Sequence, residues 1–240
     1  MRIAICEDNA DDSAELCGYI DEYLAKNGCC GYVSTFSSGE ALLNAFPGFQ
    51  IVFLDIYLPG LSGIETARHI REIDRDCIIV FITNSPHFAL DGFQVHASGY
   101  VVKPLTQEKL SDALYTCREK LNRASRTIRI PTGREGEISL PLVNLKYVEI
   151  SNKVTHFHTC GGVLDTRLPL NDVEKMLGGI PFLRCHRGFI INMNYVEEIQ
   201  ERDFLMMGGN QVPIRKNGAK EVRLAITRFM ASGNMNEVRV

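Results

Sequence analysis

The 240 residues, 45% of them hydrophobic and 23% charged, are typical of a soluble protein with two domains of ordinary size, and no apolar run approaches the roughly 20 residues that span a bilayer. The net charge of −3 is uneven: residues 1–123 hold 10 Lys and Arg against 17 Asp and Glu, whereas residues 124–240 hold 16 against 12. An acidic half joined to a basic half favours a regulatory part combined with a part that binds a polyanion.

Strand and helix patterns alternate from residue 2 to residue 122, and the first strand begins so early that we expect no secretory signal. Strands are expected at residues 3–6, 32–36, 51–54, 78–82 and 100–102, and helices at 11–25, 41–45, 62–73, 88–93 and 107–121. Five strand–helix units predict an α/β domain in which helices cover both faces of a five-stranded, parallel, doubly wound sheet.

Charged and polar side chains follow four of these strands. Glu7 and Asp8 follow the first, Asp55 the third, Thr83 the fourth and Lys103 the fifth. The carboxyl ends of parallel strands share one edge of the sheet, which is where ligands bind. Carboxylates crowded together there repel one another unless a divalent cation joins them, and Mg²⁺ prefers such oxygen ligands. With a lysine and a hydroxyl available to phosphoryl oxygens, the pattern predicts a cation-dependent phosphoryl site.

Four motifs in this half are specific in combination. They are Glu7-Asp8, Asp55 with Leu-Pro-Gly-Leu-Ser-Gly at 58–63, Phe81-Ile82-Thr83, and Tyr100-Val101-Val102-Lys103-Pro104. With them, residues 1–122 resemble a response-regulator receiver domain. The resemblance implies that Asp55 accepts a phosphoryl group from the phosphohistidine of a sensor histidine kinase, assisted by Thr83 and Lys103. It further implies that Mg²⁺ is held by Glu7, Asp8, Asp55 and the backbone carbonyl of Tyr57, and that Thr83 and Tyr100 form a switch pair.

A phosphatase of the haloacid-dehalogenase kind would also use an aspartate such as Asp55 as its nucleophile. That chemistry needs a second Asp two residues later as general acid, and this chain has Tyr57 there. The phosphate-binding pattern Gly-x-x-x-x-Gly-Lys-Ser/Thr is absent from the sequence as well. We therefore expect Asp55 to store a phosphoryl group, and we expect that the chain is not an enzyme.

The second half, which begins after a polar linker at residues 123–127, has a different pattern of apolar and polar residues. Strands are expected at residues 127–130, 137–140, 145–150, 154–158, 163–167, 189–191, 195–199, 204–207 and 211–214, and helices at 169–177 and 219–230. Many short strands separated by turn residues predict a mainly β domain over residues 128–240. Because neither helix belongs to a helix-turn-helix pattern, any nucleic acid would be recognised by loops or strand ends.

Three stretches of this half carry a second resemblance. They are Tyr-Val-Glu-Ile-Ser-Asn-Lys at 147–153, Phe-Leu-Arg-Cys-His-Arg-Gly-Phe-Ile-Ile-Asn at 182–192, and Tyr-Val-Glu-Glu-Ile at 195–199. Over about residues 126–230 the chain resembles the LytTR DNA-binding domain, and as a whole it resembles a LytTR-type (LytR/AlgR-like) response regulator. That family reads successive major grooves with loops, and the matching positions are Asn152, Lys153, Thr155, His186, Arg187, Arg215, Lys216 and Asn217. The family often has Ser where Ile214 stands, which leaves open which residue of the last loop meets a base.

Together the two resemblances imply a cytoplasmic transcriptional regulator. A kinase would phosphorylate Asp55, the receiver would form a homodimer, and two β domains would bind repeated half-sites in promoter DNA. The alternative is a phosphorylation-controlled adaptor whose β domain binds a protein. The basic excess, Arg187 and the pair Arg215-Lys216 argue against the adaptor.

Histidine and cysteine residues suggest no further site. His156 and His158 lie on one face of a predicted strand, and without a third ligand in view we expect cross-strand packing and not a metal site. The eight cysteines form no Cys-x-x-Cys or zinc-binding spacing, which favours free thiols in a reducing cytoplasm. Cys185 adjoins His186 and Arg187, so a cation could lower its pKa, but an inert, partly buried thiol is the simpler interpretation.

Overall fold

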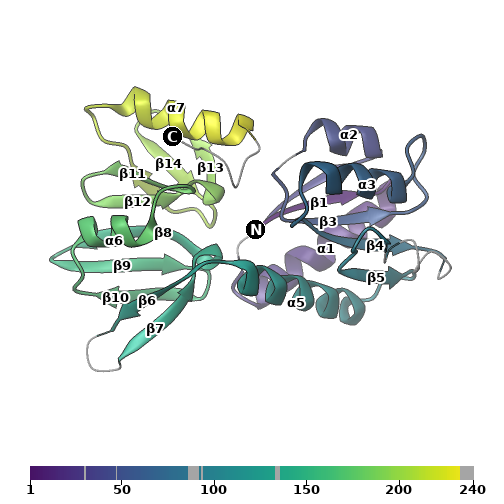
Figure 1. Cartoon of the computed structure of the whole chain (residues 1–240), viewed down its shortest axis with the longest axis horizontal. Helices are drawn as coiled ribbons and strands as arrows, with labels where there is room; N and C mark the ends of the chain where they lie inside the picture. Colours follow the sequence, from purple (N-terminus) through teal and green to yellow (C-terminus); the bar gives the residue numbers. More distant parts are fainter. Residues whose placement is uncertain (30, 47, 86–91, 93, 133–135, 233–240) are drawn as a thin grey trace. The chain divides into compact units, whose positions relative to one another are not determined.

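The computed structural model describes residues 1–29, 31–46, 48–85, 92, 94–132 and 136–232. The chain forms two compact units, Met1–Leu121 and Asn122–Val240 (Figure 1). Apart from Gly92, the helix expected at residues 88–93 lies outside the described residues. No helix within the described ranges is long and apolar enough to cross a membrane.

A five-stranded parallel sheet with the strand order β2-β1-β3-β4-β5 forms the centre of the N-terminal unit. Its strands are β1 (Arg2–Cys6), β2 (Tyr32–Phe36), β3 (Ile51–Asp55), β4 (Ile78–Thr83) and β5 (Gly99–Val102). The helices described in this unit are α1 (Ala10–Lys26), α2 (Gly39–Asn44), α3 (Gly63–Ile73) and α5 (Gln107–Ala124). The expected doubly wound α/β fold is confirmed, and all five carboxyl ends lie at one edge of the sheet.

Helices lie on both faces of this sheet (Figure 1), and alternate side chains of a strand point to opposite faces. In β1, Ile3 and Ile5 pack in one core with side chains of α1 and α5, whereas Ala4 and Cys6 pack in another with side chains of α2 and α3. Strands buried on both faces read as continuous apolar runs, and this is why the sequence locates them so well.

The C-terminal unit is mostly antiparallel β-structure. Its strands are β6 (Thr127–Pro131), β7 (Glu137–Pro141), β8 (Leu145–Ser151), β9 (Val154–Thr159), β10 (Gly162–Thr166), β11 (Phe182–His186), β12 (Phe189–Asn192), β13 (Val196–Ile199), β14 (Asp203–Met206) and β15 (Gln211–Pro213). They form a five-stranded sheet β10-β9-β8-β12-β11, a three-stranded sheet β13-β14-β15 and the pair β6-β7. The helices are α6 (Leu170–Leu177) and α7 (Ala219–Ser232), with short 3-10 turns at Leu142–Asn144 and Met193–Tyr195.

Helix α6 closes the core on one face of the five-stranded sheet. Its apolar stripe of Leu170, Val173 and Leu177 packs in a single cluster with Phe157 of β9 and Ile190 of β12. The three helix residues are spaced three and four apart, so they share one helix face. The mainly β fold expected from the sequence is thus confirmed.

Strand β11 was not among the predicted strands. Its residues Arg184 and His186 are half-buried, and the pairing with β12 shifts register between them, which marks a bulge. A bulge breaks the alternation of apolar and polar residues on which strand prediction depends. At the other end of the unit, α5 ends at Ala124 and β6 begins at Thr127, so only Ser125 and Arg126 lie between them.

Candidate functional site

Two buried carboxylates lie at the carboxyl ends of neighbouring strands in the N-terminal unit. Strands β1 and β3 pair with Cys6 opposite Leu54, so the residues that follow, Glu7 and Asp55, are neighbours as well. Each is only 5% exposed, whereas Asp8 is exposed. One oxygen from each of the three acids lies within 4.8 Å of the others. The structure therefore brings together the carboxylates that the sequence predicted as a group.

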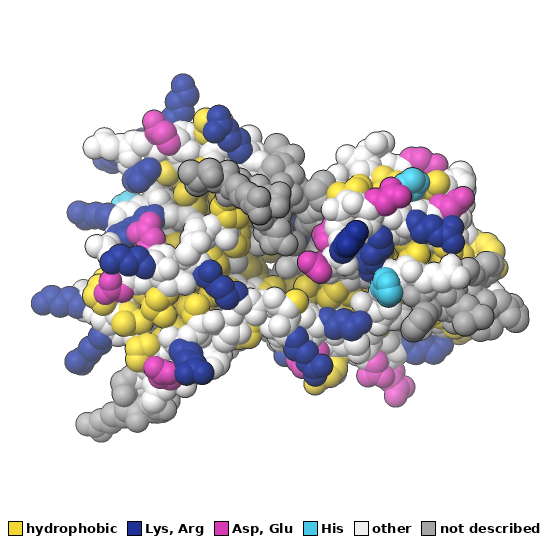
Figure 2. All heavy atoms as spheres, viewed as in Figure 1, with side chains coloured by type: hydrophobic (Ala, Val, Ile, Leu, Met, Phe, Trp, Pro, Cys, Tyr) yellow, Lys and Arg dark blue, Asp and Glu magenta, His cyan; other side chains and the backbone are white. Residues whose placement is uncertain are grey.

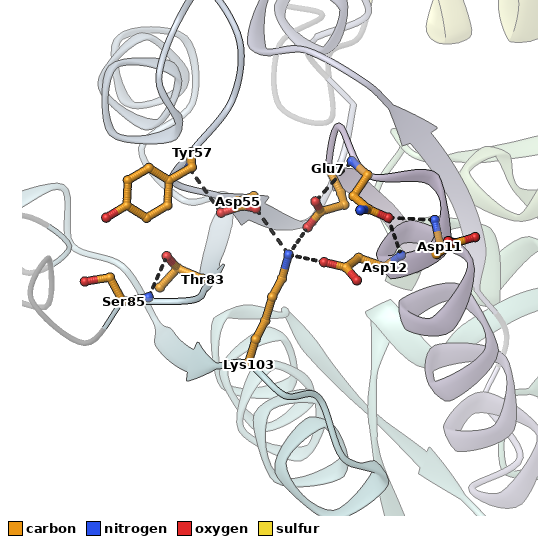
Figure 3. A network of polar contacts seen from close by, with 9 residues as sticks. Glu7, Asp11, Asp12, Asp55, Tyr57, Thr83, Ser85 and Lys103 are labelled. Carbon is orange, nitrogen blue, oxygen red and sulfur yellow. Dashed lines mark hydrogen bonds and ion pairs between the residues drawn. The ribbon is translucent and has the colours of Figure 1, made fainter.

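Lys103, after strand β5, reaches into this cluster (Figure 3). Its Nζ donates to Glu7 Oε2 at 2.8 Å and to Asp55 Oδ2 at 3.2 Å, and the side chain is only 8% exposed. Burial alone would lower the pKa of Lys103, but hydrogen bonds to Asp12 and Glu7 and the charge of Asp55 outweigh it, so the pKa is raised. Lys103 thus remains a cation beside the proposed acceptor.

Asp12 is a fourth acid in this site that sequence reasoning missed. Its Oδ2 accepts from Lys103 Nζ at 2.5 Å, the shortest of the lysine's three contacts with acids. Helix α1 places it there, since the Asn9 side chain caps the helix by accepting from the backbone N–H groups of Asp11 and Asp12. The only signal in the sequence was an acidic pair in the first turn of a helix that starts next to Glu7-Asp8.

A glycine lets helix α3 start close to Asp55. The Gly63 N–H donates to the Ile56 carbonyl at 3.0 Å, and a Cβ at Gly63 would lie 2.0 Å from the Asp55 carbonyl oxygen. No other residue fits without moving backbone. Ser62 and Glu65 then form a reciprocal capping box at the start of the helix. The Ser-Gly of the motif at 58–63 therefore fixes the turn that follows the acceptor strand.

The Tyr57 backbone N–H donates to Asp55 Oδ1 at 3.1 Å, which orients the carboxylate. The Tyr57 side chain is 54% exposed. The backbone carbonyl of Tyr57 was predicted as a metal ligand, and this stays a prediction.

The two predicted switch residues are connected through Ser85. The buried Thr83 hydroxyl accepts from the Ser85 N–H at 3.3 Å, and the Tyr100 hydroxyl donates to the Ser85 carbonyl. Tyr100 is half-buried, and its ring lies 6.5 Å from that of Phe81. Movement of the Thr83 hydroxyl would therefore break a contact with the N–H of Ser85, the residue whose carbonyl Tyr100 holds.

The donor set of the acidic cluster fits Mg²⁺. All three groups offer hard oxygen atoms, and ligands on opposite sides of one Mg²⁺ lie about 4.2 Å apart, twice the usual Mg–O distance. The observed limit of 4.8 Å requires only small side-chain adjustments. Burial raises the pKa of Glu7, and Lys103 opposes that shift by hydrogen bonding to the charged form. A bound cation would likewise favour the charged carboxylates.

A second candidate site lies at one end of the five-stranded sheet in the C-terminal unit. The β8–β9 turn is formed by Asn152 and Lys153, both exposed and both with positive φ (50° and 64°). Because Phe189 pairs with Glu149, the β11–β12 turn lies at the same end of the sheet, and Ile150 N–H donates to the Gly188 carbonyl at 2.9 Å. Two of the three predicted contact loops are therefore neighbours.

The third loop joins them through β11. The Arg215 N–H donates to the Cys185 carbonyl at 2.8 Å, which ties Arg215, Lys216 and Asn217 to the His186-Arg187 turn. Residues of both loops line an open groove of about 680 Å³ together with Glu174 and Arg184. In Figure 2, Lys and Arg side chains gather along the left-hand edge of the view, over this unit. The site thus presents cations on exposed turns.

A second groove of about 830 Å³ shares Arg187, Arg215 and Lys216 with the first. It adds two arginines that sequence reasoning missed, Arg202 and Arg223. Both stand outside the motifs that carried the resemblance, so no pattern in the sequence singled them out. Thr155, in contrast, was selected and lies elsewhere. It has no exposed surface, and its hydroxyl donates to the Leu168 carbonyl at 2.7 Å. Thr155 thus holds the segment between β10 and α6 and offers no surface to a nucleic acid.

The paired histidines of β9 are part of the packing of the sheet. His156 Nδ1 lies 2.7 Å from Asp165 Oδ1, and the His158 ring stacks on Tyr147 with centroids 4.1 Å apart. Among the residues described, only Glu7, Asp8 and Asp55 form a group of three or more possible metal ligands.

Cys185 is buried, and burial raises the pKa of its thiol to about 12 against a smaller opposing effect of Arg215. Of the two interpretations that the sequence left open, the inert thiol agrees with the structure.

Comparisons with known proteins address both units. Residues 9–115 match the model of the response regulator receiver domain, and residues 136–227 match that of the LytTr DNA-binding domain. The sensory transduction protein LytT of Oceanobacillus iheyensis is 31% identical over 179 residues, which cover 68% of this chain and 70% of that protein. The transcriptional regulatory protein LytR of Staphylococcus aureus (strain MW2) is 29% identical over 176 residues, covering 68% and 71%.

Among solved structures, the response regulatory domain of protein mrkE from Klebsiella pneumoniae is 25% identical. It covers 50% of this chain and 96% of its own, with a TM-score of 0.45.

Proposed function

Since this chain belongs to the response regulators that join a receiver domain to a LytTR DNA-binding domain, we propose that phosphorylation of Asp55 controls its binding to promoter DNA. The observation that carries this proposal is the position of Asp55. It is a buried carboxylate at a strand end, with a lysine and two further acids in contact or close by. With a sensor histidine kinase and promoter DNA as its proposed partners, it would act in the cytoplasm.

The chemistry is a transfer of a phosphoryl group between two side chains. An Asp55 carboxylate oxygen attacks the phosphorus of a kinase phosphohistidine, a P–O bond forms, and the P–N bond breaks with its electron pair returning to the imidazole. Lys103 neutralises one phosphoryl oxygen, and the Thr83 hydroxyl donates to another. Mg²⁺, held by Glu7, Asp8, Asp55 and the Tyr57 carbonyl, would neutralise the remaining charge.

The switch uses the contacts that converge on Ser85. When the Thr83 hydroxyl turns to the phosphoryl group, its contact with the Ser85 N–H breaks, which changes the hydrogen bonding of the residue whose carbonyl Tyr100 holds. Packed cores and interfaces change between discrete arrangements and not continuously. The loss of this one contact can therefore favour another state of the receiver. We propose that this state is a homodimer.

The DNA interface is formed by the three turns at one end of the β-sheet. Arg187, Arg215, Lys216, Asn152, Lys153 and Asn217 are exposed there, and His186 is half-buried. Arg can make paired hydrogen bonds to guanine and Asn to adenine, while Lys neutralises phosphates. Two such domains in a dimer would bind repeated half-sites more tightly, because the second binding event is intramolecular.

Selection of bound sequences from random double-stranded DNA tests this function. The full chain is used with Mg²⁺, with and without beryllium fluoride as phosphoryl analogue. We expect a repeated sequence to be enriched, more strongly with the analogue. Failure to enrich any sequence in either state would refute the DNA-binding role and favour the protein-binding adaptor.

A further inference from the structure

The guanidinium of Arg184 connects helix α6 to the turn that carries Arg187. Its Nη1 donates to Asn171 Oδ1 at 2.7 Å and to Glu174 Oε2 at 2.8 Å, both on the helix. Its Nη2 donates to the Arg187 carbonyl at 2.8 Å, and its Nε points to the His186 carbonyl at 3.4 Å. One side chain thus holds two consecutive carbonyl groups of the β11–β12 turn.

These contacts use most of what the side chain can donate. A guanidinium has five N–H groups in a rigid plane, and four contacts are already made inside the protein. The Arg184 side chain is 23% exposed, and the carboxylate of Glu174 lies against it at 2.8 Å. Arg187, three residues later in the turn after β11, is exposed. Arg184 is therefore built into the structure, whereas Arg187 is available to a partner.

The bulge in β11 extends this network to the last loop. The register shift lies between Arg184 and His186, and the carbonyl of the residue between them, Cys185, accepts from the Arg215 N–H at 2.8 Å. The backbone around Arg184 therefore holds the Arg215 loop while its side chain holds the Arg187 turn. A displacement at this point would move both arginines together.

We propose that Arg184 is a positioning residue for DNA recognition, which fixes the His186-Arg187 turn against helix α6 and makes no contact with DNA itself. The inference rests on the proposed DNA-binding function and deepens it. The competing explanation is that Arg184, which lines the same groove, contributes its charge directly to a phosphate. The two explanations differ in whether lysine can replace Arg184 and in how DNA binding depends on salt.

The test measures the affinity of the full chain for its selected DNA sequence over a range of salt concentrations. Neutralising one phosphate contributes about 0.9 to the slope of log K against log salt, so removing a direct contact lowers the slope by that amount. We expect Arg184→Ala and Arg184→Lys each to lose roughly tenfold in affinity with an unchanged slope, since lysine keeps the charge but cannot form the planar fork. Arg129→Ala, at an exposed strand residue of β6, is the matched control and should bind normally.

Restored binding in Arg184→Lys, a slope reduced by about 0.9 in Arg184→Ala, or unchanged affinity in both variants would overturn the inference. If either variant fails to fold in a thermal melt, Asn171→Ala with Glu174→Ala provides the same test, since it releases Arg184 from the helix. If Arg184 positions the turn, this double variant should bind DNA more weakly. If Arg184 contacts DNA directly, the double variant should bind DNA more tightly, because an acid beside it has been removed. Should the wild-type chain select no DNA, the proposed function fails before Arg184 is tested.

Discussion

Lys103 lies closer to Asp12 than to Asp55: its ammonium nitrogen is 2.5 Å from the Asp12 carboxylate and 3.2 Å from that of the proposed acceptor. The lysine that we expect to donate to a phosphoryl oxygen is therefore already bound by a side chain of helix α1. Asp12 is 36% exposed in its side chain, so the pair is partly screened by solvent. Even so, Lys103 must exchange this partner for the incoming phosphoryl group.

Replacing Asp12 with Ala should accelerate phosphorylation of Asp55 from a small-molecule phosphodonor at saturating Mg²⁺. A partly exposed ion pair is worth ~1 kcal/mol, so we expect about a fivefold faster rate, followed by intact-protein mass. Asp11→Ala is the matched control, because it removes the same charge one residue away without touching Lys103. Equal acceleration in both variants would mean that Asp12 acts only through its charge.

Arg187→Ala should weaken specific DNA binding without altering phosphorylation. A paired contact to a base contributes about 1–3 kcal/mol, so the affinity should fall by roughly fivefold to 150-fold. Fluorescence anisotropy with the selected sequence measures the loss, and the phosphorylation rate of the same sample is the internal control. Wild-type affinity at physiological salt would remove Arg187 from the interface.

His158 should titrate below its ordinary pKa of 6.5. Burial of the ring against Tyr147 lowers the pKa of His158, the Glu149 carboxylate opposes this, and smaller electrostatic effects of His156 and Lys146 lower it further. Because the unfolded chain binds the proton more tightly, His158 favours folding above pH 6.5 and loses that contribution as the pH falls.

NMR of the histidine ring protons against pH measures this directly, and loss of one signal in His158→Gln assigns it. A midpoint at or above 6.5 would show that Glu149 outweighs burial.

Cys185 should resist alkylation in the folded protein. Burial raises the pKa of its thiol to about 12, so little thiolate forms at pH 8, and the residue has no exposed surface. Peptide mass spectrometry after iodoacetamide treatment should find Cys185 unmodified and the half-exposed Cys29 modified. Rapid modification of Cys185 would instead support a redox role.

The receiver fold and the centre of its site were predictable because each depends on strand ends. Once apolar runs identify β1, β3 and β5 as parallel strands, Glu7, Asp55 and Lys103 must meet at one edge of the sheet. Asp12 was not predictable in this way, because an acid in the first helical turn has an ordinary explanation in the helix dipole. Its role depends on how far the Lys103 side chain reaches.

At the C-terminal site, prediction from the sequence fails for a different reason. The turn of Asn152 and Lys153 could be located from the pattern of strands, whereas Arg187 was selected through the resemblance alone, because the strand before it was missed. The resemblance also selected Thr155, which could not be distinguished from the turn residues. Its place at a buried position of β9 depends on which face of the sheet is covered. Arg184 was overlooked because the bulge in β11 concealed the strand, and its partners on α6 are 10 and 13 residues away in sequence.

Control of DNA binding by Asp55 is tested most directly by measuring the DNA affinity of the wild-type chain and of Asp55→Ala, each with and without Mg²⁺ and beryllium fluoride. The exposed Asp76→Ala serves as control for the loss of a carboxylate from the same unit. We predict that the analogue tightens binding of wild type and Asp76→Ala by roughly tenfold, whereas Asp55→Ala keeps the affinity of the unmodified wild type in both conditions. An equal response in Asp55→Ala, or no response in wild type, would contradict the claim that a phosphoryl group on Asp55 controls DNA binding.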